Sequence, residues 1–303
     1  MVCEVSVVVP THNRPELMKL AVESILNQGA SPTGEVIIVF DACPIELPDV
    51  VIPDGWTVKG IANTRVRGLA GARNSGILAS EGELIAFLDD DDEWLPGKLA
   101  AQLKRLAQRP EAIAVATAMV LDDGEATHVR LVSKEDLDHQ DFLRDRHPGI
   151  PSGGLLFRRE VLLGPLGLID EDIPRAYGED YDLLLRASDL GLVTVVNEPL
   201  VRVRWQGQSY YFGQWETYAA ALQYLLRKHP DFATIPSALG RIEAQVAFAL
   251  VAAGERREGR RWAWRALRHN PKQIKAALAI AISWRLVTAD AVIKFVRSRG
   301  RGI

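Results

Sequence analysis

Four adjacent aspartates, Asp89, Asp90, Asp91 and Asp92, close the apolar run at residues 84–88. An apolar run of this length predicts a buried strand, and four like charges at its carboxyl end repel one another. Mg²⁺ and Mn²⁺ prefer carboxylate oxygens and commonly bridge to phosphates. Because ligands of open α/β sheets bind at the carboxyl ends of strands, the run predicts a metal-diphosphate site. A solvated acidic turn is the alternative for this run taken alone.

Polar residues also follow two other predicted strands. Pro10 and Thr11 leave the strand at residues 5–9, and Asp41 leaves the strand at residues 36–40. Ligands of open α/β sheets bind outside the carboxyl ends of the strands, so these residues are candidates for a ligand site. For Asp41, a simple turn or helix cap is the alternative.

The elements that would position these residues alternate between strands and helices. Apolar runs predict strands at residues 5–9, 36–40, 57–61, 84–88, 113–121, 155–157, 193–196 and 200–203. Helical periodicity predicts helices from an Asn13 N-cap to residue 28, and at 70–80, 96–108 and 179–190. Residues 122–151 are polar and poorly periodic, so we expect irregular structure there. The alternation predicts an α/β fold with a mostly parallel sheet.

The pattern changes at about Gly213, after which only helices are predicted. They lie at residues 214–228, 238–253, 257–268 and 272–298, and proline or glycine separates them. The chain is therefore expected to contain an α/β domain at residues 1–212 and a helical domain at residues 213–303.

Four motifs carry a family resemblance. They are VSVVVPTHNR at residues 5–14, GARNSG at 71–76, LDDDD at 88–92 followed by Trp94, Pro96 and Lys98, and GEDYDL at 178–183. In this order they resemble glycosyltransferase family 2, the inverting nucleotide-sugar enzymes of the GT-A fold. The resemblance extends from residue 5 to about residue 205. It implies a Rossmann-like GT-A domain that binds a nucleoside-diphosphate sugar.

The resemblance also implies roles for individual residues. Those expected to bind the nucleotide are Pro10, Thr11, Asn13, Arg14, Asp41, Arg73, Asp89 and Asp90. Asp91 would be the principal ligand of Mn²⁺ or Mg²⁺ and Asp92 its support, although four identical residues allow the register to slip by one. The cation would neutralise charge on the departing diphosphate. Some relatives add a His near the last strand, but residues 203–207 contain none, so a third protein ligand is left open.

Inverting transfer also needs a base that withdraws the acceptor's hydroxyl proton. Asp180 is the first candidate and Glu179 the second. Because adjacent helical residues point about 100° apart, only one should reach the acceptor. Favourable charge at a helix N-terminus is a simpler explanation that is compatible with catalysis. The acceptor side is expected to comprise Trp94, Ser152, Gly153 and Gly154, with a core position as the alternative for Trp94.

Composition narrows the class of protein. The chain has 303 residues and two cysteines, Cys3 and Cys43, without metal-type spacing, which indicates a reducing compartment. No basic segment followed by a long apolar one opens the chain, and no uninterrupted apolar run reaches transmembrane length. We therefore expect a cytoplasmic protein that can also lie peripherally at the inner face of the membrane.

Charge is unevenly distributed along the chain. Residues 255–303 hold thirteen Lys or Arg and three Asp or Glu, which gives this segment a net charge of +10. Because the whole chain has a net charge of −3, residues 1–254 carry −13. The arginines at 256–268 accompany Trp262 and Trp264, which is typical of a helix on an anionic membrane surface. A solvated arginine face on a packed helical domain is an equal alternative. Nucleic acid is not expected as a partner, because the rest of the chain is acidic.

The leading hypothesis for function is a metal-dependent inverting glycosyltransferase. Its donor would be a nucleoside-diphosphate sugar, with UDP the commonest nucleotide in the family and thymidine and guanosine donors left open. Its acceptor would be a hydroxyl of a glycan or lipid-linked sugar in cell-envelope polysaccharide or glycoconjugate biosynthesis. A nucleotidyltransferase is one alternative, although residues 10–13 are not its expected glycine-rich loop. A non-catalytic sugar-nucleotide scaffold is the other.

Overall fold

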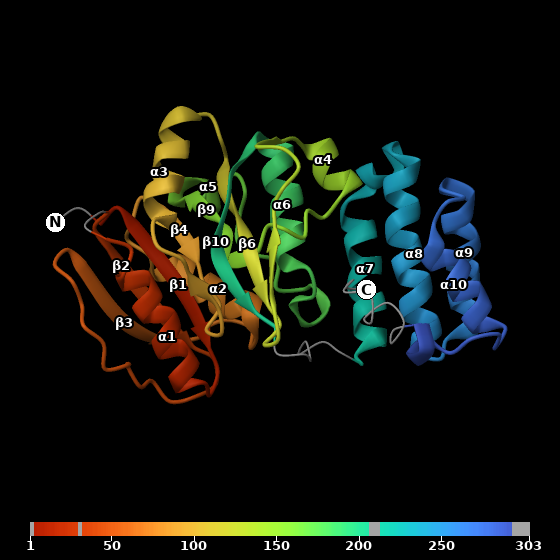
Figure 1. Ribbon diagram of the computed structural model, residues 1–303, viewed down its shortest axis with the longest axis horizontal. Helices are drawn as coiled ribbons and strands as arrows, with labels where there is room; N and C mark the ends of the chain where they lie inside the picture. Colours follow the sequence, from red (N-terminus) through yellow and green to blue (C-terminus); the bar gives the residue numbers. More distant parts are fainter. Residues whose placement is uncertain (1–2, 30–31, 206–212, 293–303) are drawn as a thin grey trace. The chain divides into compact units, whose positions relative to one another are not determined.

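The computed structural model describes residues 3–29, 32–205 and 213–292. They divide into two compact units (Figure 1). The α/β unit lies within residues 1–172 and 179–209, and the helical unit within residues 173–178 and 210–303. The short segment 173–178 thus belongs to the helical unit, although α/β residues flank it on both sides.

Parallel strands form one half of the sheet in the α/β unit (Figure 1, red to orange). In spatial order they are β3 (Trp56–Ala62), β2 (Gly34–Phe40), β1 (Val5–Thr11) and β4 (Leu84–Phe87). Every residue of β1, β2 and β4 is buried, which explains their continuous apolar sequences. The register pairs Thr11 with Phe40 and Val8 with Phe87, so residues 11, 41 and 88–92 meet at one edge.

The other half of the sheet is mixed. β9 (Leu156–Arg158) runs antiparallel between β4 and β6 (Ala114–Asp122), and β10 (Val193–Arg204) lies parallel to β6. The shorter strands are β5 (Glu93–Trp94), β7 (Thr127–Arg130) and β8 (Asp136–Leu137). The helices are α1 (Pro15–Leu26), α2 (Leu69–Ala79), α3 (Lys98–Gln108), α4 (His139–Arg144), α5 (Arg159–Leu163) and α6 (Glu179–Leu190), with the 3₁₀ turn η1 (Ser152–Gly154). The predicted α/β fold with a mostly parallel central sheet is confirmed.

Three local expectations for the α/β unit were wrong. Residues 122–151 are not irregular, because β7 pairs with β6, β8 pairs with β10 and α4 has a complete capping box at Asp138. The two strands expected at 193–203 form one strand, with register shifts around Pro199. Asn13 does not cap α1, since Arg14 occupies that position and Asn13 has a left-handed φ of 53°.

The helical unit buries small side chains between its helices. Its elements are η2 (Pro174–Ala176), α7 (Trp215–Lys228), η3 (Pro230–Thr234), α8 (Pro236–Ala252), α9 (Arg256–His269) and α10 (Ile274–Ser283). Phe248, Val251 and Ile282 pack with alanines of α8, α9 and α10 in one core. The helix expected at 272–298 is interrupted: α10 ends at Ser283 in a turn where Arg285 has a φ of 62°, and residues 289–292 are helical again. Residues 293–298 of that prediction lie outside the described residues.

Membrane-spanning helices were not expected from the sequence. Within residues 3–29, 32–205 and 213–292, no helix has both the length and the apolar character needed to cross a bilayer.

Candidate active site

The ends of β1 and β2 place Asp41 beside the start of α2. Its Oδ1 accepts a hydrogen bond from Asn63 Nδ2 at 2.7 Å, and its Oδ2 accepts one from the Gly68 backbone N–H at 2.9 Å. The backbone carbonyl of Asp41 lies 2.5 Å from His12 Nδ1. These contacts fix the carboxylate at the carboxyl edge of the parallel strands, where the sequence predicted a base-binding group.

Thr11 and Arg14 join the β1 end to the acidic run after β4. Thr11 Oγ1 donates to Asp90 Oδ2 at 2.8 Å. Arg14 Nη1 donates to Asp90 Oδ1 at 3.2 Å and to Asp91 Oδ2 at 2.8 Å. One guanidinium therefore spans two neighbouring carboxylates, while the Asn13 side chain lies 3.2 Å from the adjacent His12 ring nitrogen. The predicted nucleotide residues Thr11, Arg14 and Asp90 are brought together.

Arg73 holds the centre of the site from α2. Its side chain is 2% exposed, and its Nη2 donates to Asp89 Oδ1 at 2.5 Å while Nη1 donates to Glu179 Oε1 at 2.5 Å. Ser152 Oγ completes the group, since it accepts from Arg73 at 3.1 Å and donates to Asp89 Oδ2 at 3.1 Å. Arg73 thus ties together residues from the β4 end, α6 and η1, three segments that are far apart in the sequence.

The two candidate bases differ in environment. Glu179 is buried against Arg73, and burial, followed by the nearby Asp180 charge, raises its pKa to about 7. The Asp180 side chain keeps 21% exposure, and both of its carboxylate oxygens accept from Arg146 Nη2, at 2.9 and 3.0 Å. Burial opposes ionisation of Asp180, but the Arg146 charge prevails and lowers its pKa. Asp180 is therefore the more accessible carboxylate and stays ionised at neutral pH.

Negative charge accumulates on the acidic run. Burial is the main cause that raises the pKa of Asp90, Asp91 and Asp92, and the charge of Asp89 adds to the effect at each of them. The protein's own cations therefore leave this charge only partly offset. A hard divalent cation, which prefers carboxylate oxygens, fits this donor set.

Accessibility separates the two predicted metal ligands. The Asp91 side chain is 40% exposed, whereas Asp92 is 5% exposed and accepts from the Arg204 backbone N–H at 3.2 Å. In the described parts of the chain, no three His, Cys, Asp or Glu side chains are arranged to hold an ion.

Trp94 does not offer a stacking face for a sugar. It is 2% exposed, and Lys98 Nζ lies 3.8 Å from the centre of its ring. Its Nε1 donates to the Gly153 carbonyl at 2.9 Å, so the indole supports η1. The alternative core position is thus the correct one. Gly153 and Gly154 are buried as well, and only Ser152 of the predicted acceptor segment contacts the charged cluster.

Sequence patterns did not reveal two residues of the cluster. Arg146, the partner of Asp180, lies between α4 and η1 in the segment expected to be irregular. Asn63 follows β3 and bonds both Asp41 and Ser75, at 2.7 and 2.8 Å. Asn63 could have been found as a polar residue at a third strand end, whereas no motif marks Arg146. Pro10 is a buried residue of β1, one position before Thr11.

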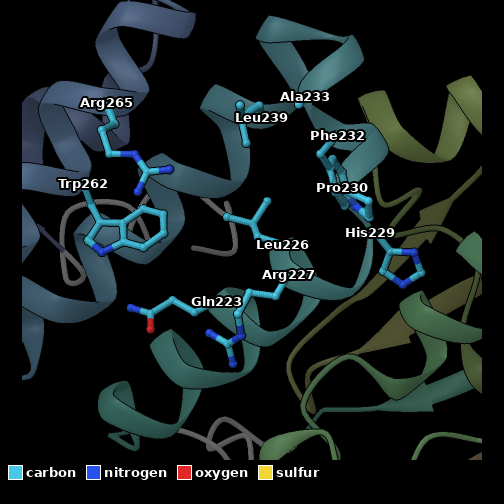
Figure 2. A pocket seen from close by; sticks show the side chains of 10 residues that line it. All are labelled: Gln223, Leu226, Arg227, His229, Pro230, Phe232, Ala233, Leu239, Trp262 and Arg265. Carbon is cyan, nitrogen blue, oxygen red and sulfur yellow. The ribbon is translucent and has the colours of Figure 1, made fainter.

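A cavity of about 410 Å³ lies in the helical unit (Figure 2). It is lined by Gln223, Leu226, Arg227, His229, Pro230, Phe232, Ala233, Leu239, Trp262 and Arg265. No predicted site residue lines it, and it offers no carboxylate. The predicted site residues that the fold brings together therefore lie in the strand-end cluster of the α/β unit.

The α/β sheet carries a buried arginine and several carboxylates at the carboxyl ends of its strands. This arrangement is that of a GT-A-like transferase. The family model described as glycosyl transferase family 2 matches residues 6–163. The chain belongs to this family, and the resemblance predicted from its motifs is confirmed.

Curated relatives agree with this assignment. The chain is 34% identical over 202 residues to the succinoglycan biosynthesis protein ExoO of Rhizobium meliloti. This alignment covers 62% of this chain and 56% of ExoO. The chain is 30% identical over 154 residues to the GalNAc(5)-diNAcBac-PP-undecaprenol beta-1,3-glucosyltransferase of Campylobacter jejuni, covering 48% and 49%. The chain thus spans about half the length of these relatives.

Solved structures share the fold at low identity. TarS 1–349 of S. aureus in complex with UDP-GlcNAc aligns with a TM-score of 0.54 and 14% identity over 90% of this chain and 89% of that one. The mannosyltransferase PcManGT of Pyrobaculum calidifontis, in complex with GDP-Man and Mn²⁺, aligns with a TM-score of 0.55 and 19% identity, covering 98% and 80%. These likenesses show the GT-A fold, and the family model supports the glycosyltransferase class.

Proposed function

We propose that this chain transfers a sugar from a nucleoside-diphosphate sugar to a hydroxyl group, with inversion at the anomeric carbon. The observation that carries the proposal is the Arg73 cluster, which links the acidic run after β4 to the carboxylate pair at the start of α6. An acidic, cation-binding group on one side of a reaction centre and a base on the other are what displacement of a diphosphate requires.

The donor is proposed to lie along the carboxyl edge of β1, β2 and β4. Asp41 would bind the base, and Thr11, Arg14, Arg73 and the first two aspartates would surround the ribose and diphosphate. A UDP-sugar is our first choice, and the UDP-GlcNAc and UDP complexes of TarS support it. The GDP-Man complex of PcManGT keeps a guanosine donor as the second choice.

Asp91 would hold Mn²⁺ or Mg²⁺, with Asp92 buried behind it as support and diphosphate oxygens completing the ligand set. The bound cation would act as a Lewis acid that neutralises charge on the leaving diphosphate. Arg73 and Arg14 already contact three of the four aspartates, so they would keep these carboxylates in place while the donor binds.

Asp180 is proposed as the general base. The acceptor oxygen would form a bond to the anomeric carbon as the bond to the diphosphate breaks, and the hydroxyl proton would pass to Asp180. The nucleoside diphosphate leaves with the bonding electrons. Glu179, whose carboxylate is bound to Arg73, would position that arginine and not contact the acceptor.

The acceptor is proposed to be a hydroxyl of a glycan or lipid-linked sugar in cell-envelope polysaccharide biosynthesis. The role of ExoO in succinoglycan biosynthesis and the undecaprenol-linked substrate of the Campylobacter transferase support this class. Ser152, the acceptor-segment residue that contacts the charged cluster, would lie at the border between donor and acceptor.

A thermal-shift screen of UDP, TDP and GDP, each with and without Mn²⁺, tests the donor. A ligand that binds only the folded state raises the melting temperature. We expect one nucleotide to stabilise the protein in a Mn²⁺-dependent way, and Asp91→Asn to remove that dependence. Exposed Asp172 provides the matched control, Asp172→Asn, which should respond like the wild type.

Product analysis tests the reaction itself. Incubation with the matching nucleotide sugar and Mn²⁺ should release the nucleoside diphosphate. Release of pyrophosphate on incubation with a nucleoside triphosphate and a sugar phosphate would instead indicate a nucleotidyltransferase. Donor binding without any turnover across a panel of hydroxyl acceptors would indicate the scaffold alternative.

A further inference from the structure

Helix α9 has two basic sides that differ in how their charges are balanced. On one side, Arg265 Nη2 lies 3.0 Å from the fully buried carboxylate of Glu243, and its guanidinium lies 4.3 Å from the Trp262 ring centre. Figure 2 shows the side chains of Trp262 and Arg265 on the wall of the cavity in the helical unit. His269 Nδ1 lies 2.6 Å from the second Glu243 oxygen. The charge on this side is therefore compensated within the protein.

The neighbouring side, which faces away from the buried residues of α9, is its outer face, which we define as Arg257, Arg261, Trp264 and Arg268. Spacings of four, three and four residues place them on one side of a helix. Gly259, Ala263 and Ala266 form the buried side. All four outer-face residues are exposed, and Trp264 keeps 55% of its surface. Among the residues that the structure describes, none forms an ion pair or hydrogen bond with these three arginines.

A second exposed tryptophan extends this face. Arg260, one turn before Trp264, lies 5.0 Å from the centre of the Trp284 ring and donates to the Ser283 carbonyl at 3.4 Å. Trp284 is 65% exposed, and Leu286 in the same turn is 76% exposed. The turn after α10 therefore adds apolar and aromatic surface to the basic helix.

We propose that the outer face of α9, together with Trp284, binds the surface of an anionic lipid bilayer. Unpaired arginines are attracted to anionic headgroups, and tryptophan prefers the boundary between headgroups and acyl chains. Glu255 and Glu258 at the start of α9 are the acidic residues nearest in sequence, so the face stays strongly positive. Exposed Leu286 beside Trp284 favours a bilayer over duplex nucleic acid, whose phosphate backbone is bound chiefly through basic side chains.

The proposal adds a second function to the chain and does not depend on its reaction. Binding should place the enzyme where lipid-linked acceptors occur, because α9 would lie in the interface plane. Each arginine near an anionic surface contributes about a fivefold factor in partitioning. Loss of three should therefore weaken binding by roughly a hundredfold.

Vesicle flotation of the full chain tests this proposal. The probes are phosphatidylcholine vesicles with and without phosphatidylglycerol, at low and high salt. We expect binding only to the anionic vesicles and a decrease in binding with salt. The variant Arg257→Gln/Arg261→Gln/Arg268→Gln should lose it about a hundredfold, and Trp264→Ser/Trp284→Ser should weaken it at unchanged charge.

The matched control is Lys19→Gln/Lys104→Gln/Arg144→Gln, which removes the same charge from the α/β unit and should bind like the wild type. Release of nucleoside diphosphate from soluble donor should be the same in all variants, which separates this test from that of the reaction. The proposal is overturned if the wild type ignores anionic vesicles, or if the α9 triple variant binds as well as the wild type. Tighter binding of the wild type to duplex DNA than to vesicles would also overturn it.

Discussion

Arginine is used in two different ways in the two units. In the α/β unit, Arg73 is 2% exposed and bonded to Asp89, Glu179 and Ser152. In the helical unit, Arg261 is exposed and has no charged partner among the described residues. Burying a charge is costly unless partners surround it, so the first arrangement persists only if its geometry is fixed. In the second arrangement the exposed guanidinium stays hydrated, so it has no desolvation cost and its charge can interact with an external partner.

The largest expected effect is on the rate of sugar transfer, and it comes from replacing Asp180, the proposed general base. Asp180→Asn keeps the shape of the side chain but removes proton acceptance, so transfer should fall by about 10²- to 10⁴-fold with little change in donor binding. Sugar transfer and the dissociation constant of the donor nucleotide measure the two quantities. Asp189→Asn, at an exposed position of the same helix, is the control and should be fully active. An Asp180→Asn enzyme within about tenfold of the wild type would refute this role.

Removing Arg73 should break the buried arrangement itself. Arg73→Met leaves Asp89 and Glu179 without their common partner, and stranding a buried charge costs about 3–5 kcal/mol of unfolding free energy. Arg261→Met should change the same quantity by less than about 0.5 kcal/mol. Urea unfolding of both variants measures the contrast. Equal losses would mean that Arg73 is not needed to compensate the cluster.

The raised pKa of Glu179 makes the free energy of unfolding depend on pH. Because its folded-state pKa is raised to about 7, its contribution to stability is fully present below its ordinary pKa and is lost as pH rises through 7. The loss amounts to up to roughly 3 kcal/mol. Denaturation at pH 5 and pH 8 without divalent cations should show it, and Glu179→Gln should reduce it. An unchanged pH dependence in the variant would contradict the assignment.

The same two carboxylates can be told apart by activity. The pKa of Asp180 is lowered, so kcat/KM should stay level between pH 8 and pH 6 if Asp180 is the base. A decline below about pH 7 would indicate Glu179 instead. The pH profile of the Arg146→Met variant sharpens the test, because loss of the Arg146 charge should move the acid limb of an Asp180-dependent profile upward.

The sequence indicated the parallel strands and their polar ends because both are local patterns. A buried strand is continuously apolar, and Asp41 and Asp89 follow directly after such runs. Arg146 and Trp94 could not be placed in this way. Arg146 acts across 34 residues of sequence, and whether an aromatic ring faces a ligand or the core depends on packing that no local pattern encodes. The family motif named Asp180, but only the fold shows what holds it.

The smallest expected effect compares the two sides of α9. Arg265→Gln removes the guanidinium 3.0 Å from buried Glu243 and leaves His269 as the remaining hydrogen-bond partner of that carboxylate. Since Arg265 is half exposed and water screens part of its charge, the loss of unfolding free energy should be about 1 kcal/mol. Arg261→Gln on the outer face should cost less than about 0.5 kcal/mol but should weaken vesicle binding. If Arg265→Gln weakened vesicle binding and left stability unchanged, the two sides would have to exchange roles, because the charge beside Glu243 would then be the one that reaches the lipid surface.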